Sequence, residues 1–388
     1  MKELREKNDL VVIGVTQEQH PDRCRLFAQW QQFDWPILHD PINLLKLRAV
    51  PVVIAIDEHG IVRNTRPQHS FLEDFIAKHF EAPSDPIPAL KVVRPDIGAL
   101  EARAKASKSF QAWRELGDAA ILWGGAKHLD LTVEAYQTAV QLKPNDAASR
   151  FRLGVAHRMR YESKLRRDDD FARAVAEWGK ALEIDPNQYI YRRRIEQYGP
   201  RLIKPYPFYD WIERAKREVK SRGETPIPLA TEPSGAEIAQ PSRMFPTSKT
   251  VVASPDPDGR INRDADRLIR ISPVVVPSRI RRGGAARIHV SFRPLTKQAH
   301  WNNESEPLRV WIESPAEWTI EKRLLESPQP KKPESREERS IEFEVRAPRG
   351  TDENATLKGY ALYFVCEEAG GKCLYLRQDF TVEIRVVE

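Results

Sequence analysis

The chain has few cysteines and no long apolar run, and both absences narrow the class of protein. Only three of its 388 residues are cysteine, an odd number that excludes a framework of paired disulfides. No apolar stretch approaches the length of a bilayer crossing, so we expect no membrane span. Residues 1–7 are charged where an export signal needs an apolar stretch, which predicts a cytoplasmic protein if Met1 is the true start.

What the sequence does hold in quantity is proline and charge of both signs. The 30 prolines cluster, which indicates linkers, and the length predicts two or three domains. The net charge of +6 is modest for this length, and no known nucleic-acid motif appears, so we expect no nucleic-acid partner. We also expect no cofactor and no metal, because the sequence has no phosphate loop and no cluster of metal ligands.

Residues 1–82 alternate strand and helix patterns, which predicts a partial α/β domain. Continuous apolar runs at 10–15 and 50–57 indicate buried strands. Apolar residues at helical spacing follow each run, at 22–33 and 71–80.

The run from Val50 to Val62 carries a family resemblance. With Pro51 opening its strand and Asp57-x-x-Gly60 following, it resembles the second half of a thioredoxin-like domain of the TlpA/AhpC type. The resemblance implies that the peptide bond before Pro51 is cis and lies beside the redox cysteines of that family.

The Cys-x-x-Cys of that family has no counterpart in this chain, nor do the strand and most of the helix that surround it. Cys24 does not replace it, because Cys24 is alone and lies past the following strand. We expect Cys24 to be a packed or idle thiol, and we expect no zinc site from Cys24 and His20.

A half domain of this kind leaves a sheet edge and an apolar face uncovered. We therefore expect that Met1 is not the native start. An upstream export signal would place the protein in the periplasm or cell envelope, and an upstream Cys-x-x-Cys would make it a thiol–disulfide oxidoreductase. In the form given, no catalytic motif is complete, and we expect no thioredoxin activity.

Residues 83–104 form a proline-rich linker, and 105–222 show a helical pattern with an internal repeat. The segments 140–145 and 182–187 are near copies, each with the proline that ends a helix. The pattern resembles the tetratricopeptide repeat (TPR), which implies either a groove for a protein partner or a helical spacer, with 208–219 as a closing helix.

Two charge runs in this helical segment need an interpretation. Residues 166–170 predict a solvated loop inserted between helices, and 192–194 predict a solvated helix face.

The tail begins with residues 223–258, rich in Pro, Ser, Thr and Gly, which predict a flexible linker. Residues 259–388 alternate apolar and polar side chains, which predicts an antiparallel β-sandwich. The predicted strands are Leu268–Val276, Ala286–Phe292, Leu308–Ile312, Ile341–Val345, Tyr360–Val365 and Leu374–Val387.

Three features of the tail carry a second resemblance. They are His300-Trp301-Asn302, the run 308–318, and the run 359–366 that ends at Cys366 and is followed by Cys373. This order resembles the N-terminal domain of the thiol–disulfide interchange protein DsbD, an immunoglobulin-like sandwich. The resemblance implies that Cys366 and Cys373 are a redox pair that passes electrons between thioredoxin-like domains, although six residues separate them here and five in the family.

The residues alone leave the role of this pair open. Two strands joined by a short glycine-containing loop bring their ends within disulfide reach. A structural staple, a redox-active pair and two free thiols all fit the pattern. Lys372 favours a thiolate, whereas Glu367 and Glu368 oppose it.

The sequence therefore predicts a multidomain α+β protein: a partial thioredoxin-like domain, a TPR-like helical segment and an immunoglobulin-like β-sandwich. Two functions follow. One is a redox-associated protein of thiol–disulfide relay type with a thioredoxin-like partner. The other is a non-catalytic scaffold that binds a protein partner through the TPR segment.

Overall fold

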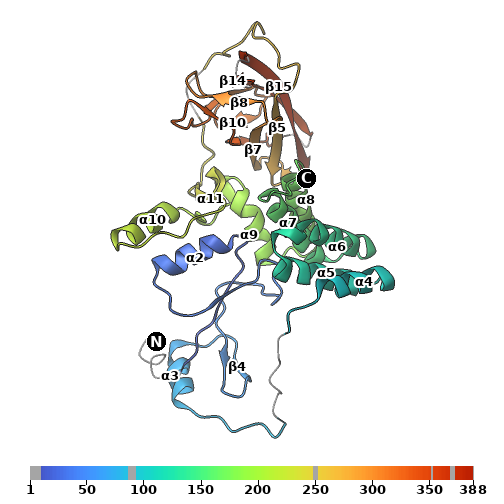
Figure 1. The fold of residues 1–388 in the computed structure, drawn as a ribbon, viewed down its shortest axis with the longest axis vertical. Helices are drawn as coiled ribbons and strands as arrows, with labels where there is room; N and C mark the ends of the chain where they lie inside the picture. Colours follow the sequence, from blue (N-terminus) through green and yellow to red (C-terminus); the bar gives the residue numbers. More distant parts are fainter. Residues whose placement is uncertain (1–9, 86–92, 248–251, 351–352, 368–371, 388) are drawn as a thin grey trace. The chain divides into compact units, whose positions relative to one another are not determined.

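The structure is a computed structural model and describes residues 10–85, 93–247, 252–350, 353–367 and 372–387. Helices and strands both contribute, in agreement with a multidomain α+β protein (Figure 1). Contacts divide the chain into two compact units, and each is described by itself. The first unit is Met1–Met159, Ile184–Tyr191 and Trp211–Thr231, and the second is Arg160–Glu183, Arg192–Asp210 and Glu232–Glu388.

The front of the first unit contains short strands and two helices. They are β1 (Gly14–Thr16), α2 (Pro21–Trp30), β2 (Ile37–His39), β3 (Ala55–Ile56), β4 (Val62–Asn64) and α3 (His69–Ala77). Strand β1 pairs with β2 in parallel, and β3 pairs with β4 antiparallel, as two separate sheets. The strands and helices expected in this segment are present in part, and β2, β3 and β4 follow one another with no helix between them.

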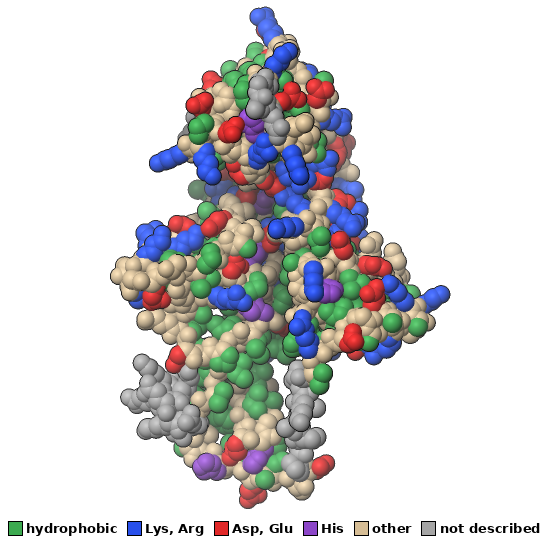
Figure 2. All heavy atoms as spheres, viewed as in Figure 1, with side chains coloured by type: hydrophobic (Ala, Val, Ile, Leu, Met, Phe, Trp, Pro, Cys, Tyr) green, Lys and Arg blue, Asp and Glu red, His purple; other side chains and the backbone are tan. Residues whose placement is uncertain are grey.

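The prediction that these strands are buried is wrong. Val11, Ile13, Val53 and Ile56 expose between 53 and 79% of their surface. Figure 2 shows hydrophobic side chains gathered on the surface of this segment. The reason is that each sheet has only two short strands, and no second layer covers them among the described residues.

Helix α10 (Ile212–Ser221) is the predicted closing helix, and it packs against α2. The Trp211 ring stacks on Trp30 and meets Phe27 edge-on. The Trp30 indole also donates to the Glu218 carboxylate over 2.6 Å. The closing helix thus packs on α2 through an aromatic cluster.

Three helices follow in the first unit: α4 (Ile97–Ser107), α5 (Phe110–Ala119) and α6 (Leu129–Leu142). Ser109 caps α5 by accepting a hydrogen bond from the Ala112 amide. Helices α5 and α6 approach closely at Gly117, where an added Cβ would lie 2.6 Å from the Tyr136 ring. A small residue at this position is what a tight helix pair needs, as in the predicted repeat.

The remaining helices of the middle segment are α7 (Ala147–Tyr161), α8 (Asp170–Ile184), α9 (Tyr189–Tyr198) and the 3-10 turn η3 (Arg201–Ile203). The boundary between the two units falls inside this segment. These helices lie within the predicted helical segment 105–222, whereas α4 begins at Ile97, inside the predicted linker 83–104. The TPR assignment stays a prediction.

The two charge runs are solvated only in part: Arg167, Asp169 and Arg192 are exposed, whereas other members are buried. Asp170 is fully buried and ion-paired with Arg160, and Asp168 pairs with two arginines of the β-sandwich, Arg270 and Arg293. The Arg193 guanidinium is buried and lies 4.0 Å from the Tyr206 ring centroid. Charge runs of this composition are usually exposed, but here oppositely charged side chains and an aromatic ring of the second unit contact several of their members.

The predicted flexible linker at 223–258 is packed over much of its described length. In the first unit, the amides of Ile227 and Ala230 donate to side chains of α2. In the second unit, α11 (Gly235–Ile238) begins with a capping box between Ser234 and Glu237. The described residues of this segment are therefore part of both units.

The strands of the second unit form two sheets. They are β5 (Ile269–Val276), β6 (Arg279–Arg281), β7 (Ala285–Pro294), β8 (His300–Asn302), β9 (Arg309–Ile312), β10 (Thr319–Ile320), β11 (Leu324–Glu326), β12 (Glu334–Ser335), β13 (Arg339–Arg346), β14 (Ala355–Cys366) and β15 (Cys373–Val387). All six predicted strands are present. One sheet has the order β10-β13-β7-β5, and the other has β11-β9-β14-β15-β6, with β8 paired to β14 and β12 paired to β8.

The two sheets share one apolar core. Phe292 and Phe343 of the four-stranded sheet belong to the same buried cluster as Tyr363, Val365 and Trp301 of the seven-stranded sheet. Because side chains alternate along a strand, Phe364 and Cys366 lie on the other, outer face of the seven-stranded sheet. The architecture is a two-layer sandwich, and its immunoglobulin-like assignment stays a prediction.

Candidate functional site

The two tail cysteines are bonded to each other across neighbouring strands. Cys366 ends β14, Cys373 begins β15, and the two residues are direct register partners. Their Cα atoms are 4.0 Å apart, well inside the limit of about 7 Å for a bridge. The predicted proximity is confirmed, and the disulfide lies at the loop end of a long hairpin.

The two sulfur-bearing residues differ in their exposure. Cys366 exposes only 4% of its surface, because β8 pairs with β14 at this point and covers it. Cys373 belongs to the exposed residues, since β15 has no described neighbour on its other side here. An incoming reactant therefore meets Cys373 first.

A histidine lies across from the buried cysteine. The β8–β14 register pairs His300 with Cys366, so both side chains leave the same face of the sheet. The His300 Nε2 atom lies 3.0 Å from a carboxylate oxygen of Glu334 on β12. The outer face thus carries His300, Cys366 and Cys373 side by side on three adjacent strands.

The next outward-facing pair of the hairpin is aromatic. Phe364 and Tyr375 are register partners whose rings stack with centroids 4.4 Å apart. Both side chains are half-buried, and the Tyr375 hydroxyl accepts a hydrogen bond from Arg309 on β9. A partly exposed apolar platform therefore adjoins the disulfide.

The charged residues that flank the pair are exposed. Glu367 and Lys372 both lie at the surface, and the Glu367 amide donates to the Lys372 carbonyl over 3.4 Å. Glu368 lies outside the described residues. Their opposite charges were expected to act on the thiols in opposite directions.

The other predicted site residues lie in the first unit, in the front segment. The Val50–Pro51 peptide bond is cis. Cys24 is a free, half-buried thiol on α2, and burial is the main cause that raises its pKa. The His20 Nδ1 atom lies 2.8 Å from the Glu18 carboxylate. No group of three or more metal-ligating side chains occurs among the described residues.

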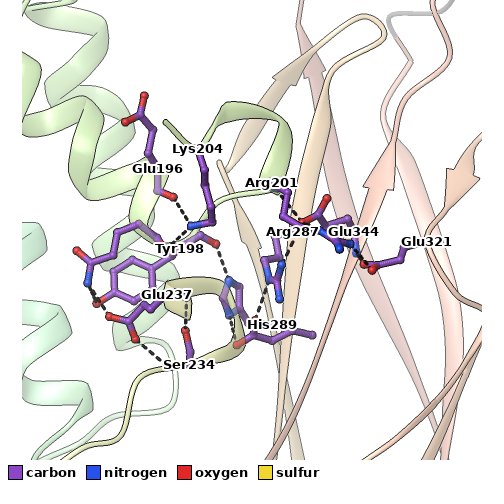
Figure 3. Close-up of polar contacts among 12 residues, drawn as sticks. Glu196, Tyr198, Arg201, Lys204, Ser234, Glu237, Arg287, His289, Glu321 and Glu344 are labelled. Atoms are coloured by element: carbon purple, nitrogen blue, oxygen red, sulfur yellow. Dashed lines mark hydrogen bonds and ion pairs between the residues drawn. The ribbon is translucent and has the colours of Figure 1, made fainter. Parts of the chain in front are cut away.

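A second concentration of titratable groups lies inside the second unit, where α9, η3 and α11 meet the outer face of the four-stranded sheet (Figure 3). We call it the buried polar cluster: Arg201, Lys204, Glu237, Arg287, His289, Glu342 and Glu344. Its members bond to each other or to the backbone. His289 on β7 lies 2.8 Å from the Tyr198 carbonyl oxygen, and Glu344 on β13 accepts from Arg287 and Arg201.

Two members of the buried polar cluster have strongly shifted pKa values. Burial is the main cause that lowers the pKa of Lys204 to about 7. For Glu342 burial acts in the opposite direction, and the interactions with His289 and Arg287 overcome it and lower the pKa to about 2. Shifts of this size occur at active sites and also at structural ion networks.

The buried polar cluster has the features of a structural ion network. An open pocket of about 520 Å³ adjoins it and is lined in part by Arg201, Arg287, Glu321 and Glu342. Each of these four side chains already bonds to another charged side chain of the protein. The ion pairs of this cluster hold η3 on the four-stranded sheet.

Sequence reasoning missed this cluster because its residues are scattered and belong to ordinary strand and loop patterns. The alternation of Glu342 and Glu344 with apolar residues predicts an exposed polar face, because the outer face of a sandwich is usually in contact with solvent. The sequence does contain one indication of the cluster: Arg287 and His289 occupy the polar positions of β7, the strand that pairs with the one carrying Glu342 and Glu344.

Comparisons with known proteins do not identify this chain. No protein-family model matches it. No curated protein matches it either. Among solved structures, AvmM, which catalyses macrocyclization in alchivemycin A biosynthesis, is 14% identical with a TM-score of 0.19 and covers 31% of this chain and 89% of its own. The alkylpurine DNA glycosylase AlkC of Pseudomonas fluorescens, bound to DNA with an abasic site analog, is 12% identical with a TM-score of 0.16. The match covers 74% of this chain and 75% of the glycosylase chain. These similarities are too low to carry an argument.

One further property concerns membranes. Among the residues that the structure describes, no helix combines the length and the hydropathy of a membrane span.

Proposed function

We propose that this protein is redox-associated and that its Cys366–Cys373 pair exchanges electrons with a thioredoxin-like dithiol partner. The observation that carries the proposal is the asymmetry of the bonded pair: Cys373 is exposed and Cys366 is buried. Thiol–disulfide exchange needs one sulfur that an attacking thiolate can reach and one that leaves. A hairpin end with one exposed cysteine supplies both.

The exchange runs in two balanced steps. A thiolate of the partner attacks the Cys373 sulfur, a bond forms between the two proteins, and the electron pair of the old bond leaves with the Cys366 sulfur. The second thiol of the partner then attacks its own sulfur in the mixed disulfide and releases Cys373. The partner dithiol is oxidised to a disulfide, the tail pair is reduced, and the two protons of the partner end on Cys366 and Cys373.

The stacked rings of Phe364 and Tyr375 support this proposal, since a partner must rest beside the disulfide during the attack. Aromatic side chains with polar tips are favoured at protein interfaces. The pair is half-buried and adjoins the exposed cysteine on the same face.

A redox titration tests the proposal. The variant Cys24→Ser keeps the tail pair as its only thiols, and its equilibrium with glutathione and dithiothreitol gives the reduction potential. A relay pair is expected at about −270 mV or above, near the thioredoxin-type couples. A potential below about −300 mV would instead assign the disulfide to a structural staple.

A trapping experiment tests the assignment of the two sulfurs. Cys366→Ser keeps the exposed thiol and is expected to form a stable mixed disulfide with a thioredoxin-like protein that lacks its resolving cysteine. Cys373→Ser is the matched control, and its buried thiol is expected to react at least about tenfold more slowly. Equal trapping rates would contradict the assignment.

The scaffold function remains the second candidate, and one observation favours it. The front segment exposes aliphatic side chains at Val11, Ile13, Val53 and Ile56, a surface of the kind that protein partners cover. A pull-down with the disulfide-free variant Cys366→Ser/Cys373→Ser separates the candidates. A scaffold retains its partner in this variant, whereas a relay loses its exchange partner.

A further inference from the structure

Three outward-facing side chains lie in one row across three strands of the tail. The register places His300 on β8 opposite Cys366 on β14, and Cys366 opposite Cys373 on β15. Directly opposed residues of an antiparallel pair have Cβ atoms about 4.5–5.5 Å apart. The histidine is therefore the neighbour of the buried cysteine, on the side away from the disulfide partner.

The two ring nitrogens of His300 have different surroundings. Nε2 lies 3.0 Å from the Glu334 carboxylate, which is itself 72% exposed. Nδ1 is buried and has no hydrogen-bond partner among the described residues. A buried polar atom without a partner is costly and calls for an explanation. The disulfide form offers none, because its sulfur atoms are weak acceptors without charge.

We propose that His300 stabilises the Cys366 thiolate that forms when the Cys366–Cys373 bond opens. This proposal rests on the proposed exchange function and adds to it the group that compensates the buried anion. An unpaired thiolate at a buried position would pay a large desolvation cost. A protonated imidazole beside it lowers that cost, and Glu334 holds the far nitrogen of the ring.

The remaining charged side chains around the pair do not supply this compensation. Glu367 and Lys372 flank the cysteines from β14 and β15, are exposed, and carry opposite charges. From the side of β8, His300 faces Cys366 in the register, and the Glu334 carboxylate reaches the His300 ring from the position opposite Asn302. The histidine is thus the side chain that the register places opposite Cys366 on β8.

The test measures the ionisation of Cys366 directly. In Cys24→Ser/Cys373→Ser, Cys366 is the remaining thiol, and its thiolate absorbs near 240 nm. Adding His300→Asn is expected to raise the measured pKa of Cys366 by about one unit or more, which means about tenfold less thiolate at a given pH. In the bonded pair, the same change is expected to disfavour reduction about tenfold, which corresponds to about 30 mV toward negative potentials.

Two further variants serve as a second test and as a control. Glu334→Gln changes only an exposed carboxylate and is expected to shift the Cys366 pKa in the same direction by a smaller amount. Thr356→Ala, on the same face of β14 but at the opposite end of the hairpin, is the matched control and is expected to change nothing. Far-UV circular dichroism of each variant shows that the sandwich is retained, and if His300→Asn unfolds, the Glu334→Gln titration decides the question.

The outcomes separate this proposal from the proposed function. If the pair exchanges with a thioredoxin-like dithiol but His300→Asn leaves both the thiol titration and the potential unchanged, His300 has no such role. If the pair has the potential of a staple but His300→Asn still raises the Cys366 pKa, the exchange function is overturned and the histidine assignment stands.

Discussion

Trp30 of α2 and Trp211, just before α10, stack with ring centroids 5.8 Å apart and planes within 3° of parallel. The two residues are far apart in sequence, and Phe27 completes the cluster by meeting the Trp211 ring edge-on at 5.1 Å. The stack joins the front segment of the first unit to the helix that was expected to close the repeats.

We expect Trp211→Ala to destabilise the first unit by about 3 kcal/mol, because it removes the stack and leaves a cavity against α2. Urea unfolding followed by tryptophan fluorescence measures the change. Trp211→Phe, which keeps an aromatic ring, is the control and should cost clearly less. An unfolding transition unaffected by Trp211→Ala would show that α2 and α10 do not depend on each other.

The Arg160–Asp170 pair predicts a larger effect. Both side chains are buried and hydrogen-bond to each other through two guanidinium nitrogens. Arg160→Met leaves a buried carboxylate without its cation and should cost about 3–5 kcal/mol of unfolding free energy.

The matched control for this pair is Arg173→Met. Arg173 pairs with Asp169 at the surface, where both side chains are about half exposed, so this change should cost less than about 1 kcal/mol. Similar losses in the two variants would mean that the buried pair contributes no more than a surface pair.

Lys204 predicts a pH dependence of stability. Its pKa, lowered by burial to about 7, lies far below the value of about 10.4 for an unfolded chain. Between these two values the unfolded state binds more protons, so the unfolding free energy rises with pH. Relative to Lys204→Met, the wild type should gain about 2 kcal/mol between pH 7 and pH 9.

Urea unfolding of both proteins at pH 7, 8 and 9 measures this difference, in which the other titrating groups cancel. Below pH 7 the two curves should run parallel, because Lys204 is then protonated in both states. A constant difference from pH 7 to 9 would mean that Lys204 stays charged in the folded protein, held by its bonds to the Glu196 and Gln197 carbonyls.

The elements of the tail could be predicted from sequence because alternation along a strand is a local property. The same alternation failed for the environment of Glu344, which is fully buried although it occupies a polar position. What buries it is η3, whose Arg201 comes from 143 residues earlier in the chain. No local pattern contains that information.

For the candidate site, too, sequence reasoning predicted what depends on local pattern and missed what depends on the fold. The closeness of Cys366 and Cys373 follows from a short loop between two strand patterns, and sequence reasoning predicted it. The difference in their exposure depends on β8, a three-residue strand whose pairing with β14 is set by the fold. His300 was noted only as part of a family resemblance, because its place opposite Cys366 depends on that register.

In the front segment, apolar runs were taken as evidence of burial, and the exposure of Val53 and Ile56 shows the limit of that inference. An apolar run indicates a strand that needs a cover, and it does not guarantee that the cover lies in the described part of the chain.

The position of the disulfide at the end of a long hairpin sets how the pair behaves once it is reduced. The register from Ala355↔Ile384 to Val365↔Leu374 continues to hold the strands together when the sulfur–sulfur bond is open. The two thiols therefore face each other at a high effective concentration. Once an oxidising disulfide partner has formed a mixed disulfide with Cys373, the Cys366 thiolate attacks the Cys373 sulfur in a unimolecular step and releases the partner's thiol. Any mixed disulfide on Cys373 is consequently short-lived as long as Cys366 is present, and the protein returns to its oxidised form without refolding.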